Sequence, residues 1–241
     1  MKTKAISILF AISIIFQTAQ AHAVATALLF NGTGSSPGDV AALAKILTSM
    51  GISYETASSA KINSMSRTTL AKYKMIVWPG GNSIDMGNSL TYTATANIKS
   101  AVSRYGVSYI GFCAGAFMAE SSNLYNVFNL APTWFDFYQP NLIDMVVTHF
   151  PDGSQRHLVY WQGPHVQGFG SVIAKYPNGQ AAIAEGKVGN GFVILSGVHP
   201  EAPADWRTGF ATQDFDGVTA DINFTKTLMN AALYRMPLPS Y

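Results

Sequence analysis

Residues 107–117 read VSYIGFCAGAF, and this stretch decides the fold. An apolar run of strand length, Val107 to Phe112, leads directly into Cys113, and a segment of small residues follows. Gly111 and Gly115 lie two residues on either side of Cys113, where the missing Cβ atoms permit a tight turn and the close approach of neighbouring chain. The pattern is typical of a nucleophile held on a sharp turn between a strand and a helix.

Apolar runs of strand length alternate with helical segments around this stretch. The expected strands are 24–30, 52–57, 75–78, 107–112 and 191–196, and the expected helices run from Pro37 to about Met50, from Thr91 to Tyr105 and from Val218 to Arg235. Ser36 is placed to cap the first helix, which has Pro37 in its first turn. Alternation of this kind predicts an α/β fold, with a mainly parallel sheet covered by helices on both faces.

The character of the chain changes between about residues 124 and 185, where short β-type runs are separated by turn signals. The runs are 145–149, 157–161, 171–176 and 181–185, and the turns lie at Asp152-Gly153 and Asn178-Gly179. We expect an antiparallel β extension of the same domain. The domain prediction is therefore a single unit over residues 24–241.

Residues 1–23 have the pattern of a secretory signal peptide. Lys2 and Lys4 form a positive start, 5–16 is an apolar stretch, and Ala21-His22-Ala23 is a small-x-small cleavage site. No later segment is long and apolar enough to cross a bilayer. We expect an exported protein, periplasmic or secreted, that is not inserted in the membrane after cleavage.

Charge and cysteine content narrow the function. Removing Lys2 and Lys4 from the 15 basic residues leaves 13, which equals the number of acidic residues, so nothing favours a nucleic-acid partner. Cys113 is the only cysteine, so it has no partner for an internal disulfide in an oxidising compartment. A buried apolar thiol or an intermolecular disulfide are the alternatives to a nucleophile, and the flanking glycines favour the nucleophile.

A cysteine nucleophile needs a base and a group that orients the base. His199-Pro200-Glu201 directly follows the strand 191–196. Residues two apart in extended chain point to the same side, so the imidazole and the carboxylate can meet. We predict that Cys113 is the nucleophile, His199 the general base and then acid, and Glu201 the group that holds the imidazole tautomer. The alternative is a loop histidine beside a solvated carboxylate.

Acyl chemistry also needs hydrogen-bond donors for the developing oxyanion. Gly80 and Gly81 follow the strand 75–78 in a Pro-Gly-Gly turn, and Ala114 begins the segment after Cys113. Carboxyl ends of parallel strands meet at one edge of a sheet. The amides of Gly80, Gly81 and Ala114 are therefore the predicted oxyanion hole.

Four motifs together carry a resemblance to a known family. They are Phe30-Asn31-Gly32-Thr33-Gly34, Trp78-Pro79-Gly80-Gly81, Gly111-Phe112-Cys113-Ala114-Gly115-Ala116-Phe117 and Tyr160-Trp161-Gln162-Gly163-Pro164-His165. With His199-Pro200-Glu201, this order of motifs resembles the class I glutamine amidotransferase-like superfamily. The residues within the four motifs are similar to those of the branch described as the amino-terminal domain of biotin-protein-ligase-like proteins. The resemblance implies a flavodoxin-like α/β sandwich and a Cys-His-Glu catalytic triad.

The sequence also departs from the superfamily pattern. Phe117 stands where the resemblance implies a glutamine that helps to hold the substrate, so ordinary glutamine recognition is not expected. Ala114 replaces the histidine that follows the elbow cysteine in the intracellular-protease and DJ-1-like branches. No biotin-ligase catalytic segment is recognisable, so biotin transfer is not expected.

The remaining site predictions concern the substrate. The candidates to line the pocket are Asn31, Phe117, Trp161, Gln162 and His165. For three of them the sequence leaves an alternative open: Asn31 could instead fix a turn, Trp161 pack in the core and His165 lie in a surface loop. His149 and His157 lack the spacing of a metal site, and neither metal nor cofactor is expected. The sequence predicts a cysteine hydrolase that cleaves an amide of a small molecule or peptide through a thioester. Two other classes stay open: a binding protein without turnover, and a redox or electrophile sensor.

Overall fold

The computed structural model describes residues 25–119, 136–166, 168–210, 212 and 216–241. The expected signal peptide at 1–23 lies outside the described residues. The first half of the chain alternates strands and helices as expected: β1 (Ala27–Phe30), α1 (Pro37–Ser49), β2 (Tyr54–Ala57), α2 (Ser59–Ser64), α3 (Arg67–Leu70), β3 (Met75–Trp78), α4 (Ser83–Asn88), α5 (Tyr92–Ser103), β4 (Ser108–Phe112) and α6 (Ala114–Phe117). The second half is mostly β: β5 (Asp136–Phe137), β6 (Ile143–His149), β7 (Gln155–Trp161), β8 (Pro164–His165), β9 (Ser171–Lys175), β10 (Ala181–Val188), β11 (Gly191–Ser196), η1 (Ala204–Arg207) and α7 (Val218–Tyr234).

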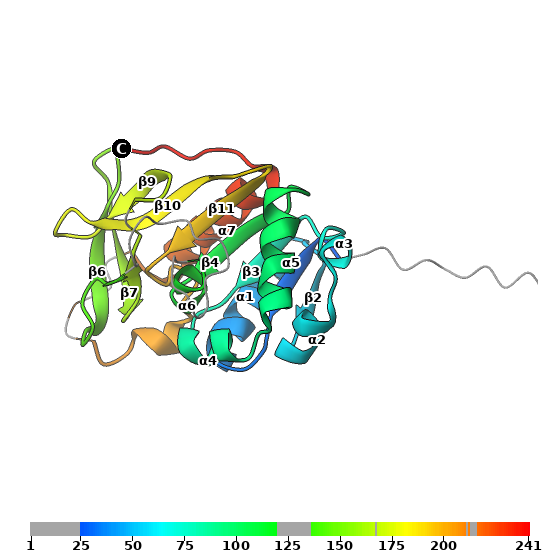
Figure 1. The fold of residues 1–241 in the computed structure, drawn as a ribbon. Helices are drawn as coiled ribbons and strands as arrows, with labels where there is room; N and C mark the ends of the chain where they lie inside the picture. Colours follow the sequence, from blue (N-terminus) through cyan, green and yellow to red (C-terminus); the bar gives the residue numbers. More distant parts are fainter. Residues whose placement is uncertain (1–24, 120–135, 167, 211, 213–215) are drawn as a thin grey trace, which may run out of the picture.

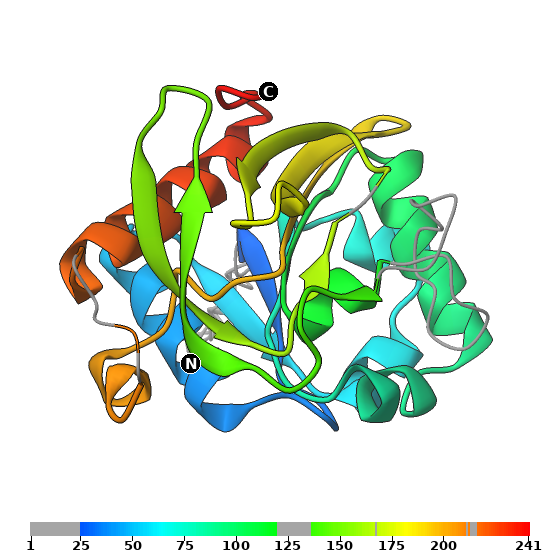
Figure 2. The same cartoon turned by 90° about the vertical axis from the view of Figure 1, so that its left-hand side faces the viewer.

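Nine strands form one sheet in the order β2-β1-β3-β4-β11-β10-β9-β6-β7. The first five are parallel and the last four pair antiparallel, so the expected β extension continues the main sheet. Figure 1 shows this sheet with α5 on one side and α1 and α7 on the other. Figure 2 views the molecule from the side on which the β6–β7 hairpin (yellow-green) lies. The short strands β5 and β8 form a separate pair that the sequence did not suggest.

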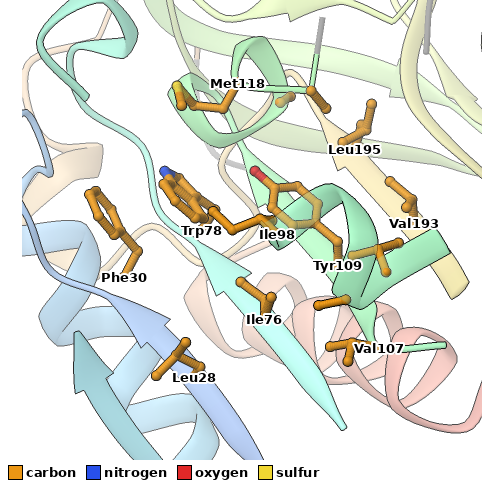
Figure 3. Packing of buried hydrophobic residues seen from close by; sticks show 14 of the residues in the cluster. Leu28, Phe30, Ile76, Trp78, Ile98, Val107, Tyr109, Met118, Val193 and Leu195 are labelled. Carbon is orange, nitrogen blue, oxygen red and sulfur yellow. The ribbon is translucent and has the colours of Figure 1, made fainter. Parts of the chain in front are cut away.

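Strand residues alternate between two hydrophobic clusters, one on each face of the sheet. On one face Phe30, Trp78 and Tyr109 pack with α5, and the rings of Phe30 and Trp78 stack with centroids 4.1 Å apart (Figure 3). On the other face Leu29 and Val77 pack with α1 and α7. Burial on both faces explains why these strands read as continuous apolar runs, and the α/β sandwich prediction is confirmed.

Helix ends follow the local sequence closely. Ser36 caps α1 by accepting a hydrogen bond from the amide of Asp39, as expected, and the helix gives way to Gly51 at φ +67°.

Among the described residues, none of the helices has both the length and the apolar character that crossing a bilayer requires.

Candidate active site

Cys113 occupies a strained turn between β4 and α6. Its backbone has φ 47° and ψ −105°, a conformation that costs a non-glycine residue about 1–3 kcal/mol and that persists only when its surroundings enforce it. The amide of Cys113 donates to the Ser196 carbonyl of β11 at 2.7 Å, and the Cys113 carbonyl accepts from the amides of Ala116 and Phe117. These hydrogen bonds maintain the strained turn, which places the sulfur at the carboxyl end of the parallel strands.

The two glycines around Cys113 are required by close packing. A Cβ on Gly111 would lie 2.4 Å from the Gly115 carbonyl oxygen, and a Cβ on Gly115 would lie 2.4 Å from the Trp78 carbonyl oxygen. Both clashes are with backbone, so no side-chain movement relieves them. Close approach explains the glycine spacing from which the elbow was predicted.

His199 and Glu201 follow β11, which lies next to β4 in the sheet. The His199 amide donates to the Val159 carbonyl, and this bond ties the loop to β7. Nδ1 of His199 lies 2.7 Å from Oε1 of Glu201, and both side chains are buried. This is the contact predicted from their spacing. It leaves Nε2 as the ring nitrogen available for proton transfer.

The position of Gly80 shows how close the side chains of His199 and Cys113 lie to each other. A Cβ at Gly80 would lie 2.6 Å from Cε1 of His199 and 3.5 Å from Cβ of Cys113. The imidazole of His199 and the side chain of Cys113 therefore lie on the same rim of the sheet, on either side of a position that only glycine fits. The thiol also contacts the Trp161 carbonyl oxygen, at 3.5 Å from Sγ.

The charge on His199 depends on its neighbours. Burial lowers the pKa of His199, but the charge on Cys113, a hydrogen bond with Cys113 and the charge on Asp39 outweigh burial, so the pKa lies above the ordinary 6.5. An imidazolium beside the sulfur stabilises the thiolate, which is the nucleophilic form of cysteine. The charges around His199 therefore favour its protonated form.

Asp39 is the site residue that the sequence analysis missed. It lies in the first turn of α1, is fully buried, and accepts a hydrogen bond from the Gly80 amide through Oδ2. Asp39, His199 and Glu201 each place a potential ligand atom within 4.8 Å of the others. Its only sequence signal is that it follows the loop after β1, which ends at the same sheet edge as Cys113.

The two buried carboxyl groups influence each other. Burial, followed by the charge of Glu201, raises the pKa of Asp39 well above 3.8. Burial also raises the pKa of Glu201 to about 8, against the lowering effects of its own amide, Asp39 and Arg207. Oδ1 of Asp39 and Oε2 of Glu201 receive no donor from elsewhere among the described residues, and the hydrogen bond between the two carboxyl groups also raises the pKa of Asp39. At neutral pH the pair therefore holds at least one proton.

The oxyanion prediction needs one correction. The Gly80 amide donates to Asp39, so it is not available to a developing oxyanion. Within the described chain, the amides of Gly81 and Ala114 have no hydrogen-bond acceptor. Gly81 has φ +141°, and a Cβ there would lie 2.1 Å from the Gly34 carbonyl oxygen. Gly81 and Ala114 are the donors left at the site.

A cavity of about 580 Å³ opens above these groups. Cys113, His199 and Gly81 lie at its polar floor. Its apolar wall comes from strand ends and from the segment around η1: Ile143, Trp161, Trp206 and Phe210. The predicted chemistry therefore faces a space large enough for a substrate.

Of the five residues predicted to bind the substrate, one lines the cavity. Trp161 lines the cavity, so it does not pack in the core. The other four residues do not line it. Asn31 is exposed beyond β1, and Gln162 donates its side-chain amide to the Pro140 carbonyl.

Phe117 and His165 are turned away from the cavity by local packing. The ring of Phe117 packs against Phe137, with centroids 5.1 Å apart. His165 is buried in β8, which pairs with β5. Both residues belong to motifs near the site in sequence, but ring packing against Phe137 directs Phe117 elsewhere, and strand pairing does the same for His165.

The residues that take their place come from the segment 204–210, in which no motif was recognised. Trp206 packs between His199 and Trp161, with ring centroids at 5.5 and 5.8 Å. Arg207 anchors the segment because its guanidinium lies 2.7 Å from Asp221 of α7 and bonds the Ala202 carbonyl. The signal that was present is Asp205-Trp206-Arg207, an aromatic residue between charges shortly after His199.

The group Asp39, His199 and Glu201 has the donor types that a divalent cation takes. Oδ2 of Asp39 already accepts from Gly80, and Oε1 of Glu201 lies against His199. These bonds account for half of the carboxylate oxygens of the group. The expected absence of a metal stays a prediction.

Comparisons with known proteins agree with this geometry. Residues 25–130 match the family model described as "Biotin-protein ligase, N terminal". This segment of the chain is similar to that family over the matched residues. The biotin-protein ligase N-terminal match includes the Cys113 elbow and the Pro79-Gly80-Gly81 turn, and it ends before His199. No curated protein sequence matches the chain.

Solved structures show the fold over most of the chain. A protein assigned as a GMP synthase subunit, from Thermoplasma acidophilum, is 13% identical, with a TM-score of 0.57, over 89% of this chain and 98% of that chain. A glutamine amidotransferase from Methylobacillus flagellatus is 14% identical, with a TM-score of 0.53, over 87% and 90%. One from Thermotoga maritima is 11% identical, with a TM-score of 0.51, over 75% and 77%. The glutamine amidotransferase-like fold is confirmed.

Proposed function

We propose that this protein is an exported, cysteine-dependent amide hydrolase that uses Cys113, His199 and Glu201 as a catalytic triad. Its substrate is an amide of a small molecule or of a peptide. The observation that carries the proposal is the strained Cys113 elbow at the floor of an open cavity, beside a histidine whose pKa it raises. Export rests on the signal pattern of residues 1–23.

The first half-reaction forms a thioester. The thiolate of Cys113 attacks the amide carbon, and the carbonyl π electrons move to oxygen, where the amides of Gly81 and Ala114 donate to the oxyanion. The tetrahedral intermediate then collapses, the C–N bond breaks, and its electron pair leaves with nitrogen. Nε2 of His199 gives that nitrogen a proton, so ammonia or an amine departs.

The second half-reaction restores the enzyme. His199, now neutral, takes a proton from water, and the oxygen attacks the thioester carbonyl. The C–S bond breaks, its electron pair returns to sulfur, and the product leaves as a carboxylic acid. Glu201 holds Nδ1–H throughout, so that Nε2 faces the reacting atoms.

Alkylation of the single cysteine tests the proposal. Cys113 should react with iodoacetamide at neutral pH, because the thiolate is the reactive form and a protonated His199 lies beside it. Cys113→Ala should take up no label while keeping the circular dichroism spectrum of the folded protein. His199→Gln should slow the reaction about tenfold or more at the same pH, because the neighbouring positive charge is lost.

Trapping the intermediate is the second measurement. An activated amide substrate should leave an acyl group on Cys113, seen by mass spectrometry and removed by hydroxylamine. If His199→Gln alkylates as fast as the wild type and no acyl group accumulates, the hydrolase is wrong and the cavity belongs to a binding protein. Reversible oxidation of Cys113 that does not depend on Glu201 would instead favour a redox sensor.

A further inference from the structure

The cavity above Cys113 has an apolar, mainly aromatic wall. Trp161 and Trp206 meet at a ring angle of 63°, and Phe210 and Ile143 complete the wall around them. Trp161 and Ile143 are 44% and 42% exposed, an uncommon degree for apolar side chains beside a polar floor. Exposed aromatic surface that lines a concave site gains free energy when a ligand removes it from water.

The charge around the cavity is unsuited to an anion. Among the described residues that line it, no lysine or arginine is present, and Asp205 is the only carboxylate. Arg207 is next to Asp205 in sequence, but its guanidinium is directed into the protein toward Asp221, with only 5% of the side chain exposed. A substrate carboxylate placed away from His199 would therefore lose its hydration without gaining a lysine or arginine partner.

Size supports the same conclusion. About 580 Å³ is within the range of sites that enclose a drug-sized molecule. The floor carries the groups for the amide, and the aromatic wall rises from the Trp206 ring that packs on His199. The reacting amide and an apolar group attached to it therefore have adjacent places in one cavity.

We infer that the substrate is an amide whose acyl part ends in an aromatic or branched apolar group and carries no carboxylate. This inference rests on the proposed hydrolase, whose substrate class it names. Trp161, Trp206 and Phe210 take up the apolar group, and Asp205 disfavours anions. Glutamine, with a carboxylate at the end away from its amide, is a poor fit.

A matched pair of amides tests the inference. 4-Phenylbutanamide and glutaramate share the same chain and amide, and differ in carrying a phenyl ring or a carboxylate at the far end. Binding is measured to Cys113→Ala by tryptophan fluorescence or calorimetry, and ammonia release is measured with the wild-type protein. We expect the phenyl compound to bind about tenfold or more tightly than glutaramate.

Two variants locate the effect. Trp161→Ala should reduce this preference about threefold or more, and Asp205→Lys should shift it toward glutaramate. Asp152→Lys makes the same charge change, and Tyr92→Ala also removes an aromatic ring, at exposed positions outside this cavity; both should leave the preference unchanged.

The outcomes separate the inference from the proposed function. Equal binding, or tighter binding of glutaramate, overturns the inference even when ammonia is released. A preference for the phenyl compound with no ammonia release from either amide overturns the hydrolase and supports the cavity's ligand class. If neither the binding preference nor ammonia release is observed, the inference and the proposed hydrolase are both overturned.

Discussion

The floor and the wall of the cavity are built in different ways. The floor residues Cys113, His199 and Gly81 directly follow strands or lie within three residues of a strand end, and neighbouring strands set their positions. The wall residues Trp206 and Phe210 belong to a loop segment that is held by Arg207 and by packing against β6 and β7. The floor therefore rests on the sheet, while the wall combines the strand residues Ile143 and Trp161 with a loop segment attached through a few contacts.

The wall is most sensitive to loss of its anchor. Arg207→Met should destabilise the protein by about 3–5 kcal/mol, because Asp221 then loses its buried countercharge. Urea unfolding measures the change, and Arg207→Lys should recover part of it. A loss under 1 kcal/mol in the Met variant would show that the guanidinium does not anchor the wall.

The floor is most sensitive to any side chain at position 80. Gly80→Ala should slow alkylation of Cys113 by about a hundredfold, because the new Cβ displaces the His199 ring. Gly153→Ala is the control: its φ of +83° strains an alanine in the β6–β7 turn, but its Cβ meets nothing within 4 Å, so the alkylation rate should not change. Equal rates in the two variants would contradict the close approach of Gly80 and His199.

The state of Asp39 is open to an isosteric test. If Asp39 is the neutral member of the carboxyl pair, Asp39→Asn keeps both contacts, because the amide oxygen accepts from Gly80 and the NH₂ group donates to Glu201. Its alkylation rate should stay within about threefold of the wild type, whereas Asp39→Ala should slow the reaction about tenfold. A loss in Asp39→Asn as large as in Asp39→Ala would mean that the negative charge is needed.

Stability should depend on pH through the same groups. The pKa values of Asp39, Glu201 and His199 all lie above their ordinary values, so each group contributes stability that is complete below its ordinary pKa. That stability is lost as pH rises through the folded pKa, which for Glu201 is about 8. The unfolding free energy should fall between about pH 5 and pH 8, and less steeply in Asp39→Asn. An equal slope in wild type and variant would contradict the raised pKa of Asp39.

The parts of the site predicted from the sequence share one property: each depends on a local pattern at the end of a strand. Gly111 and Gly115 predicted the elbow because the close backbone approach at these positions excludes a Cβ. The His199–Glu201 contact was predictable because residues two apart in extended chain share a side. Asp39 was read only as part of a helix start, since nothing local shows that its side chain turns toward Gly80.

The sequence by itself determined the α/β class, the order of the parallel elements and the meeting of Cys113 with His199, because strand burial and strand ends obey short-range rules. Only the tertiary structure decided which amides and side chains face the cavity. The Gly80 amide is used by Asp39, Gln162 and His165 are directed elsewhere by their partners, and Trp206 enters from a distant loop. These outcomes depend on contacts between segments far apart in the chain, and a linear pattern holds no record of such contacts.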